Sequence, residues 1–291
     1  MKNQLPRRLV PVLFALLALL LLPGLLRPFP VAEPEAEARL TPLPTDPPVA
    51  TPVPAGRLER GEGIYYSYDP SLFVTDERGR ITYSDPAYTS LTGIDVSEFQ
   101  YDINWQQVKE DGIDFAIIRT GYRGYSAGSL YEDKYFRKNI AGATAAGLPI
   151  GVYFFSTATT PREAREEAAF ILSQIEGYDV TLPIVFDLEI LSEEYRTYTM
   201  DRRTLYRTAR AFCDAIEESG HTPAIYMTQY LGYRKYILRD LADVPFWYAE
   251  YYVNSPTFVF NFDIWQYSDT GSVAGINGNV DLDLYLIPKE G

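Results

Sequence analysis

From residue 91 onward, short runs of β-forming residues alternate with stretches of helical periodicity, and this alternation limits the folds open to the chain. Helices are expected at 132–146, 162–175 and 202–219, where apolar residues recur at helical spacing. Strands are expected at 93–98, 115–122, 150–156, 183–190, 224–229, 246–252, 264–267 and 282–287. Strand–helix repeats favour a parallel sheet covered by helices. We predict an α/β fold, an irregular β/α (TIM-like) barrel of about eight strands, with helices mainly after the first five.

A doubly wound open sheet is the alternative arrangement of the same elements. Short links join the last three strands, so we expect the barrel to be irregular at its end. The barrel domain is assigned to residues 91–291. Residues 58–90 form a small extension before it, in which runs at 72–74 and 81–83 flank a turn at Gly79 and predict a hairpin that packs on the barrel.

The first 57 residues have the composition of a membrane segment followed by a tether. Residues 1–30 carry four basic residues, no acid, and an apolar run from 9 to 26. Residues 31–57 contain seven prolines and favour an extended linker. No small-x-small cleavage pattern follows the apolar run closely, so we expect an uncleaved anchor with the folded part outside the membrane. The alternative is that the segment is a signal peptide, which is cleaved to release a secreted protein.

Composition excludes several classes of protein. One cysteine cannot form an internal disulfide, and one cysteine with one histidine cannot supply an ordinary zinc site. The net charge is −13 for the chain and, without the four basic residues of 1–30, −17 for residues 31–291. This acidity argues against nucleic-acid binding. We expect no metal, no cofactor and a monomer.

Carboxylates gather at the predicted strand ends. Asp187 and Glu189 are two apart on one strand, so they share a face with Cα atoms about 6.6 Å apart. Asp95 ends the first strand, and Asp281 and Asp283 begin the last. A closed barrel makes its first and last strands neighbours, so we expect Asp95 and Asp281 to lie close together at the mouth where barrel active sites are found.

Like charges in one cleft raise one another's pKa values, and desolvation adds to the effect. The result is a protonated acid beside ionised carboxylates, the combination that breaks a glycosidic bond. Two alternatives remain open here. Some of the acids could cap helices or bind backbone amides, or the cluster could hold magnesium or calcium through oxygen ligands.

Aromatic residues also fall at or near the strand ends, where their ring faces could pack on sugars. We predict a substrate-binding set from them, while expecting about half to belong to the core. The set is Tyr122, Tyr153, Phe155, Tyr226, Trp247, Tyr251, Trp265 and Tyr267.

Seven ordered motifs resemble glycoside hydrolase family 25, the Chalaropsis-type lysozymes. They are residues 93–97 (GIDVS), 103–105 (INW), 152–156 (VYFFS), 186–189 (FDLE), 247–251 (WYAEY), 264–268 (IWQYS) and 275–281 (GINGNVD). The likeness covers roughly residues 91–287. Three positions depart from the family pattern: Tyr101 stands where glycine is common, Phe154 where histidine is frequent, and Asp283 where asparagine is usual.

The resemblance implies an N-acetylmuramidase that cleaves the β-1,4 bond between N-acetylmuramic acid and N-acetylglucosamine in peptidoglycan. By its position in the motif, Glu189 resembles the family's general acid. Asp187 would stabilise the substrate N-acetyl group or the oxocarbenium ion. Asp95 and Asp281 would complete the site and hold the sugar. Substrate assistance and a carboxylate nucleophile both remain open.

The resulting expectation is a cell-wall remodelling enzyme on the outside of a bacterial membrane, with peptidoglycan glycan strands as its partner. The alternative from another class is a catalytically inactive barrel that binds peptidoglycan as a sensor or scaffold. A hydrolase acting on chitin-like chains is a third possibility.

Overall fold

The computed structural model describes residues 65–66 and 68–289, so the predicted anchor and linker lie outside the described residues. The helical elements are η1 (Pro70–Leu72), η2 (Glu98–Gln100), α2 (Trp105–Glu110), α3 (Phe136–Ala145), α4 (Pro161–Ile175), α5 (Arg202–Glu218), η3 (Leu231–Lys235) and η4 (Leu238–Leu241). The strands are β1 (Phe73–Thr75), β2 (Ile81–Tyr83), β3 (Tyr88–Val96), β4 (Phe115–Arg123), β5 (Leu130–Glu132), β6 (Ile150–Ser156), β7 (Ile184–Leu188), β8 (Pro223–Thr228), β9 (Phe246–Ala249), β10 (Ile264–Gly271) and β11 (Val280–Pro288).

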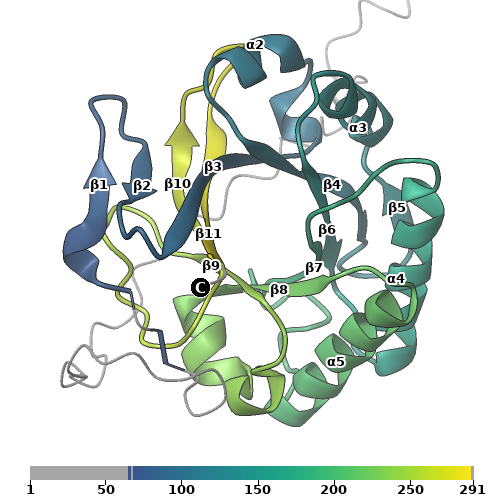
Figure 1. The fold of residues 1–291 in the computed structure, drawn as a ribbon. Helices are drawn as coiled ribbons and strands as arrows, with labels where there is room; N and C mark the ends of the chain where they lie inside the picture. The colour runs from purple at the N-terminus through teal and green to yellow at the C-terminus, as the bar shows by residue number, and fades with distance from the viewer. Residues whose placement is uncertain (1–64, 67, 290–291) are drawn as a thin grey trace, which may run out of the picture. The chain divides into compact units, whose positions relative to one another are not determined.

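Eight strands close into a barrel, seen end-on in Figure 1. The sheet runs β3-β11-β10-β9-β8-β7-β6-β4, and β3 also pairs with β4 in parallel register, which joins the two ends. This pairing confirms the predicted barrel and excludes the open doubly wound sheet. β5 is an additional edge strand, antiparallel to β4.

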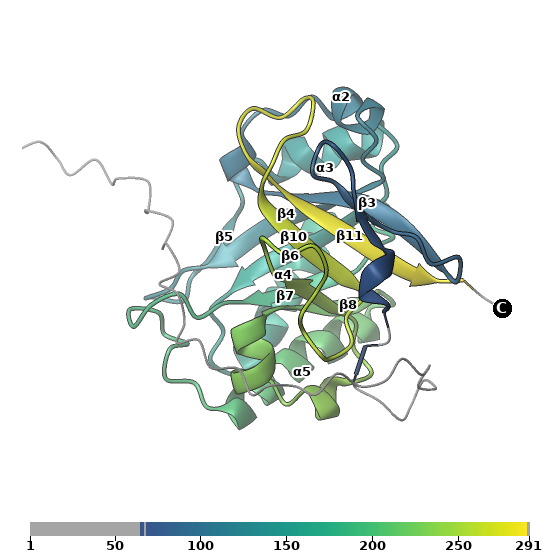
Figure 2. The ribbon, with the colours of Figure 1, turned by 90° about the vertical axis from the view of Figure 1, so that its left-hand side faces the viewer.

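All eight predicted barrel strands are present, but the last one runs in an unexpected direction. β11 is antiparallel to both β10 and β3, because the short connection after β10 turns back on itself without a crossing helix. Helices α2, α3, α4 and α5 follow β3, β4, β6 and β7, whereas only the short turns η3 and η4 follow β8. Figure 2 views the barrel from the side that carries β1 and β2, with strand β11 crossing in the foreground and α5 at the bottom.

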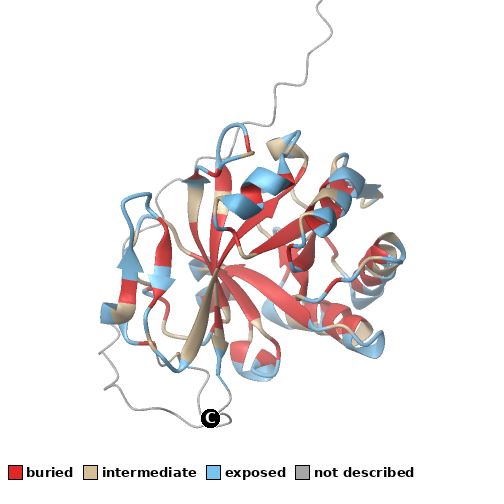
Figure 3. Cartoon of the chain, turned by 45° about the horizontal axis from the view of Figure 1, so that its top comes forward, coloured by how far each residue is buried: buried red, intermediate tan, exposed pale blue. Residues whose placement is uncertain are grey.

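Side chains alternate between two apolar clusters on either side of the barrel wall. On β7, Val185 belongs to the inner cluster, while Phe186 and Leu188 belong to the outer one. Figure 3 shows the barrel strands buried and the outer sides of the helices exposed. Gly93 on β3 is inward, and a Cβ there would lie 2.2 Å from the ring of Phe115, so glycine makes room for that inner ring.

The β1–β2 hairpin covers part of the barrel wall that no helix covers. It turns at Gly79, which has φ +77°, at the position expected from the sequence. Phe73 packs edge-on against Trp265 of β10, with ring centroids 5.5 Å apart. Arg80 and Arg78 both pair with Asp111 after α2, which ties the hairpin to the first β/α unit. The hairpin therefore substitutes for a helix outside β10.

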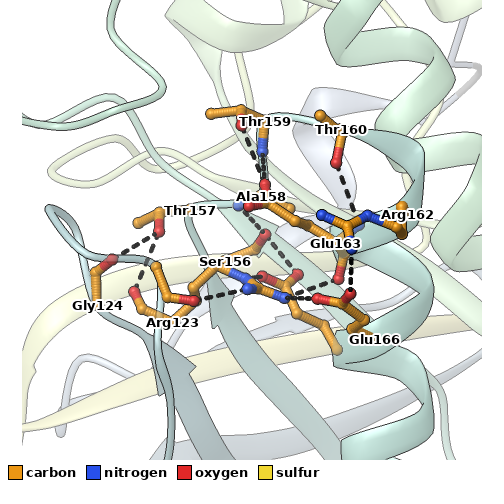
Figure 4. A network of polar contacts seen from close by, with 12 residues as sticks. Arg123, Gly124, Ser156, Thr157, Ala158, Thr159, Thr160, Arg162, Glu163 and Glu166 are labelled. Carbon is orange, nitrogen blue, oxygen red and sulfur yellow. Dashed lines mark hydrogen bonds and ion pairs between the residues drawn. The ribbon is translucent and has the colours of Figure 1, made fainter.

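A buried ion pair between Arg123 and Glu167 ties β4 to α4, and a hydrogen bond from Ser156 adds β6. Figure 4 shows Arg123 and Ser156 within this polar network. Glu167 of α4 is completely buried and accepts hydrogen bonds from Arg123 Nε at 2.6 Å and Ser156 Oγ at 2.7 Å. Burial raises the pKa of Glu167 to about 7, although the bonds from Ser156 and Arg123 oppose the rise. Arg123 also donates to the backbone oxygens of Gly128 and Glu163.

No helix within residues 65–66 and 68–289 is both long and apolar enough to cross a bilayer.

We predict that Arg123→Ala lowers the free energy of unfolding by about 3–5 kcal/mol, because it leaves the buried Glu167 carboxylate without its counter-charge. Urea unfolding of the full chain measures this loss. The control is Arg162→Ala, which removes the ion pair with Glu166 at 3.6 Å from a side chain that is 83% exposed. Exposed pairs contribute about 0–1 kcal/mol, so equal losses in the two variants would contradict the importance of the buried pair.

Candidate active site

Asp187 and Glu189 lie together at the carboxyl end of β7. The alternation along β7 directs Asp187 inward, where it is in register with Phe155 of β6 and Tyr226 of β8. Asp187 is 5% exposed, and its Oδ1 has no hydrogen-bond partner among the described residues. Glu189 follows the strand directly and is partly exposed. The pair therefore combines a deep carboxyl with one that can reach a ligand at the mouth.

Both carboxyls hold protons more tightly than usual. Burial raises the pKa of Glu189 to about 7. Burial first, and then the charge of Glu189, raise the pKa of Asp187 well above its ordinary value, while the Arg119 guanidinium opposes that rise. Coupled carboxyls titrate as a unit. The geometry thus provides a site that retains a proton near neutral pH, as general acid catalysis requires.

Asp95 and Asp281 face each other across the seam that closes the barrel. They are directly opposite in the antiparallel β3–β11 register, although 186 positions separate them in the sequence. Directly opposite residues project to the same side of a sheet. Burial raises the pKa of Asp95 well above its ordinary value, and the charges of Asp281 and Asp283 add to the rise. The structure thus brings together the two acids that barrel closure predicts.

Gln266 of β10 connects this seam to the aromatic side of the site. Its Nε2 donates to Asp95 Oδ2 at 2.6 Å. Its Oε1 accepts from the hydroxyls of Tyr226 at 3.2 Å and Tyr251 at 2.5 Å. A single amide therefore fixes a carboxylate and two phenols, and sequence reasoning did not identify it. The signal was present in strand alternation, which places Gln266 on the opposite face from both of its aromatic neighbours.

Asp283 lies inside the barrel, below the acids at its mouth. It is completely buried, and its Oδ1 accepts a hydrogen bond from Trp247 Nε1 at 2.8 Å. Burial raises the pKa of Asp283 well above its ordinary value; the bond from Trp247 opposes the rise, and the charge of Asp281 adds to it. Its charge also raises the pKa of Asp95, as like charges in one cleft do. Its role in placing Trp247 was not predicted.

Five predicted aromatic residues line the interior or pack against its inner cluster. Tyr153, Tyr226 and Trp247 belong to the cluster, and Tyr251 packs on it. Phe155 is next to Asp187 in the strand register. The sixth residue, Tyr122, is in register with Phe155 because the pairing of β4 with β6 shifts at a bulge between Arg119 and Gly121. Such a bulge changes the direction of the side chains that follow it.

The prediction for Trp265 and Tyr267 is wrong. Both side chains lie in the outer cluster, with Trp265 completely buried and Tyr267 nearly so. The Trp265 indole donates to the backbone oxygen of Glu250, and its ring packs against Phe73 of the hairpin. These two residues therefore attach the extension to the barrel and do not line the site. Because Gln266 points inward to Asp95, strand alternation directs its two aromatic neighbours outward.

Arg119 of β4 is a charged residue of the interior that sequence reasoning missed. Its Nε donates to Asp133 Oδ2 at 2.7 Å, and its Nη2 donates to Glu98 Oε1 at 3.2 Å. The guanidinium lies over the rings of Phe99 and Tyr122, at 5.1 and 5.7 Å from their centroids. The phase of β4, in which Phe115 and Ile117 are inward, predicts the direction of Arg119. It supplies positive charge beside a cluster of acids.

The described residues contain no group of three or more His, Cys, Asp or Glu side chains arranged to hold a metal ion. The site combines a proton-retaining pair, two facing acids, an arginine and an inner set of aromatic rings. This combination suits the binding of a sugar and the protonation of a leaving oxygen.

Comparison with known proteins relates the barrel to enzymes. A sequence model of glycosyl hydrolases family 25 matches residues 94–276, a range that contains Asp95, Asp187 and Glu189. The autolytic lysozyme of Clostridium acetobutylicum is 30% identical over 193 residues, which cover 66% of this chain and 55% of that protein. Lysozyme M1 of Streptomyces globisporus is 32% identical over 213 residues, covering 67% of this chain and 68% of that protein.

A solved structure supports the same assignment. The bacterial lysozyme of Streptomyces coelicolor superimposes with a TM-score of 0.57 at 29% identity, covering 68% of this chain and 92% of that one. The family match spans well over half of the sequence and the strand order is that of a closed barrel. The chain therefore belongs to glycosyl hydrolases family 25, as its motifs predicted.

Proposed function

We propose that this protein hydrolyses peptidoglycan, cleaving the β-1,4 bond between N-acetylmuramic acid and N-acetylglucosamine. The observation that carries the proposal is the Asp187–Glu189 pair, a proton-retaining pair of acids at the mouth of a family 25 barrel. The relatives named lysozymes support the substrate class. The chain spans 55% of the length of the first of these relatives, so the substrate is inferred from the site and the shared barrel together.

In the proposed reaction, Glu189 gives its proton to the glycosidic oxygen. The bond between the anomeric carbon and that oxygen breaks, and the oxygen leaves as a hydroxyl of the departing sugar. Positive charge develops at the anomeric carbon and is stabilised either by Asp187 directly or by the substrate N-acetyl oxygen that Asp187 orients. Water then adds at the anomeric carbon and its proton returns to Glu189, which restores the acid.

The remaining polar groups hold the sugar. Asp95 and Asp281, opposite each other on β3 and β11, are placed to accept hydrogen bonds from sugar hydroxyls. Gln266 fixes one oxygen of Asp95, and Tyr226 and Tyr251 are fixed by the same amide. Because these side chains are already held in place, little binding free energy is lost in ordering them.

Glu189→Gln tests the proton donor, since it keeps the side-chain size and removes the acid. We expect kcat for release of reducing ends from peptidoglycan to fall about 10²- to 10⁴-fold, the usual contribution of general acid catalysis. The assay uses the full chain and purified peptidoglycan, and thermal unfolding checks that the variant is folded.

The matched control is Glu194→Gln, which makes the same change at an exposed residue in the following loop. It should leave kcat within about twofold, since a change of that size corresponds to only a few tenths of a kcal/mol. Equal activity of Glu189→Gln and the wild type would exclude the assigned role. A folded wild-type protein that binds peptidoglycan without releasing ends would place the barrel in the binding class.

Activity should fall as pH rises through about 7, because the Asp187–Glu189 pair then loses the proton that the leaving oxygen needs. The raised pKa means that the acid form persists through the mildly acidic range, where an ordinary glutamate would already be ionised. The profile of kcat/KM against pH measures this descending limb. A rate that stays level up to pH 9 would show that no proton of this pair takes part.

We further propose that the protein acts from the outer side of a bacterial cell membrane, with residues 1–30 as an uncleaved anchor and 31–57 as the tether. The support comes from the sequence: a basic tip, an apolar run, and a remainder of charge −17. Full-length protein carrying a C-terminal tag should remain in the membrane pellet after an alkaline carbonate wash. A soluble tagged product lacking its first residues would instead indicate cleavage.

A further inference from the structure

Three aromatic rings from three different segments form a continuous row beside the active site. Phe155 of β6 meets Tyr195 edge-to-face, with centroids 6.3 Å apart. Tyr195 in turn stacks on Tyr125, at 5.4 Å and an interplanar angle of 28°. We call these three residues the aromatic row. Only Phe155 was expected to bind substrate.

The row begins at the reacting groups and ends in solvent. Phe155 is next to Asp187 in the β6–β7 register, so the first ring adjoins the proposed site. Tyr195 lies in the loop after Glu189, and Tyr125 lies in the turn between β4 and β5, where it is 39% exposed. A row with this course extends the binding surface away from the scissile bond without interruption.

Arg196 holds the two outer rings in position. Its backbone N–H donates to the backbone oxygen of Tyr125 at 3.2 Å. Its Nη2 donates to Glu163 Oε1 at 2.7 Å and Thr159 Oγ1 at 3.2 Å. Glu163 also accepts from the Thr159 N–H, a bond of the polar network in Figure 4. One residue thereby fastens the loop of Tyr195 to the turn of Tyr125 and to the start of α4.

The guanidinium of Arg196 also packs against Gly128, in the space that a larger residue's side chain would fill. A Cβ on Gly128 would lie 2.1 Å from Arg196 Nη1, and Gly128 has φ +72°, in the left-handed region that glycine favours. The turn of residues 124–129 is therefore shaped around Arg196. This close fit makes the row a preorganised surface, which lowers the ordering cost of binding.

Tyrosine rings present an apolar face and a polar edge at low conformational cost, which suits an apolar sugar face bordered by hydroxyls. The proposed substrate is a polymer, so sugars on both sides of the scissile bond continue past Asp187 and Glu189. A surface continuous with the site is then covered by the same glycan strand.

We propose that the aromatic row forms an additional subsite for a sugar of the peptidoglycan glycan strand beyond the scissile bond, and that Arg196 is its positioning residue. This inference rests on the proposed function of the same site. It assigns substrate binding to Tyr125 and Tyr195, and it predicts that the enzyme acts better on long strands than on fragments too short to reach them.

The test uses the full chain with Tyr125→Ala and Tyr195→Ala on long glycan strands and on the shortest fragments cleaved. Each substitution should raise KM on long strands about five- to twentyfold with kcat unchanged, because binding remote from the reaction contributes equally to ground and transition states. On the short fragments the variants should match the wild type. The matched control is Tyr65→Ala: Tyr65 is 46% exposed and stacks on Phe260 at 5.4 Å, in the extension outside the barrel.

Arg196→Ala tests positioning separately. It should raise KM on long strands like the tyrosine substitutions, and it should add little when combined with Tyr125→Ala and Tyr195→Ala, because it acts through those rings. A further rise in the triple variant, or a fall in kcat alone, would contradict the positioning role.

The outcomes separate this inference from the proposed function. Unchanged KM in both tyrosine variants of an active enzyme overturns the subsite while the hydrolase assignment stands. An equal rise in KM on long strands and on short fragments would show that the two tyrosines do not bind a sugar remote from the scissile bond. A KM effect that disappears when stem peptides are trimmed from long strands assigns the row to peptide and overturns sugar stacking. A wild-type chain inactive on every glycan refutes the hydrolase and the subsite together.

Discussion

The pairing of β3 with both β4 and β11 is the constraint on which the rest of the structure depends. It closes the sheet, and closure divides every barrel strand into an inward and an outward set of side chains. It also places Asp95 opposite Asp281, so two acids from the beginning and the end of the domain form one side of the site. The reversed direction of β11 makes this contact a directly opposed pair, and leaves an outer surface that the β1–β2 hairpin covers.

Burial then gives the enclosed acids their chemistry. Asp95, Asp187, Glu189 and Asp283 all have raised pKa values, and desolvation is the first cause in each case. Buried polar groups are costly without partners. Gln266, Trp247 and Arg119 meet part of that cost by hydrogen bonds or charge, and in doing so they fix the positions of the acids and rings. The groups that stabilise the interior are thus the same groups that organise the site.

Much of this arrangement was predictable from two simple periodicities. Alternation on one strand predicted that Asp187 and Glu189 share a face, and closure predicted the Asp95–Asp281 contact. On β10 the same alternation directs Gln266 inward and Trp265 and Tyr267 outward, so the substrate-binding role predicted for these two rings is wrong. The irregularity that directs Tyr122, the reversal of β11 and the loop contacts of Tyr195 and Arg196 depend on tertiary packing, so no local pattern indicates them.

The proposed reaction cleaves the β-1,4 bond between N-acetylmuramic acid and N-acetylglucosamine, so each cut creates a new reducing end on N-acetylmuramic acid. The most direct measurement is the identity of the new reducing end, obtained by digesting peptidoglycan with the full chain, reducing the products with borohydride and analysing them by mass spectrometry. We expect fragments that end in reduced N-acetylmuramic acid. Fragments that end in reduced N-acetylglucosamine, or intact strands after prolonged incubation with folded protein, would contradict it.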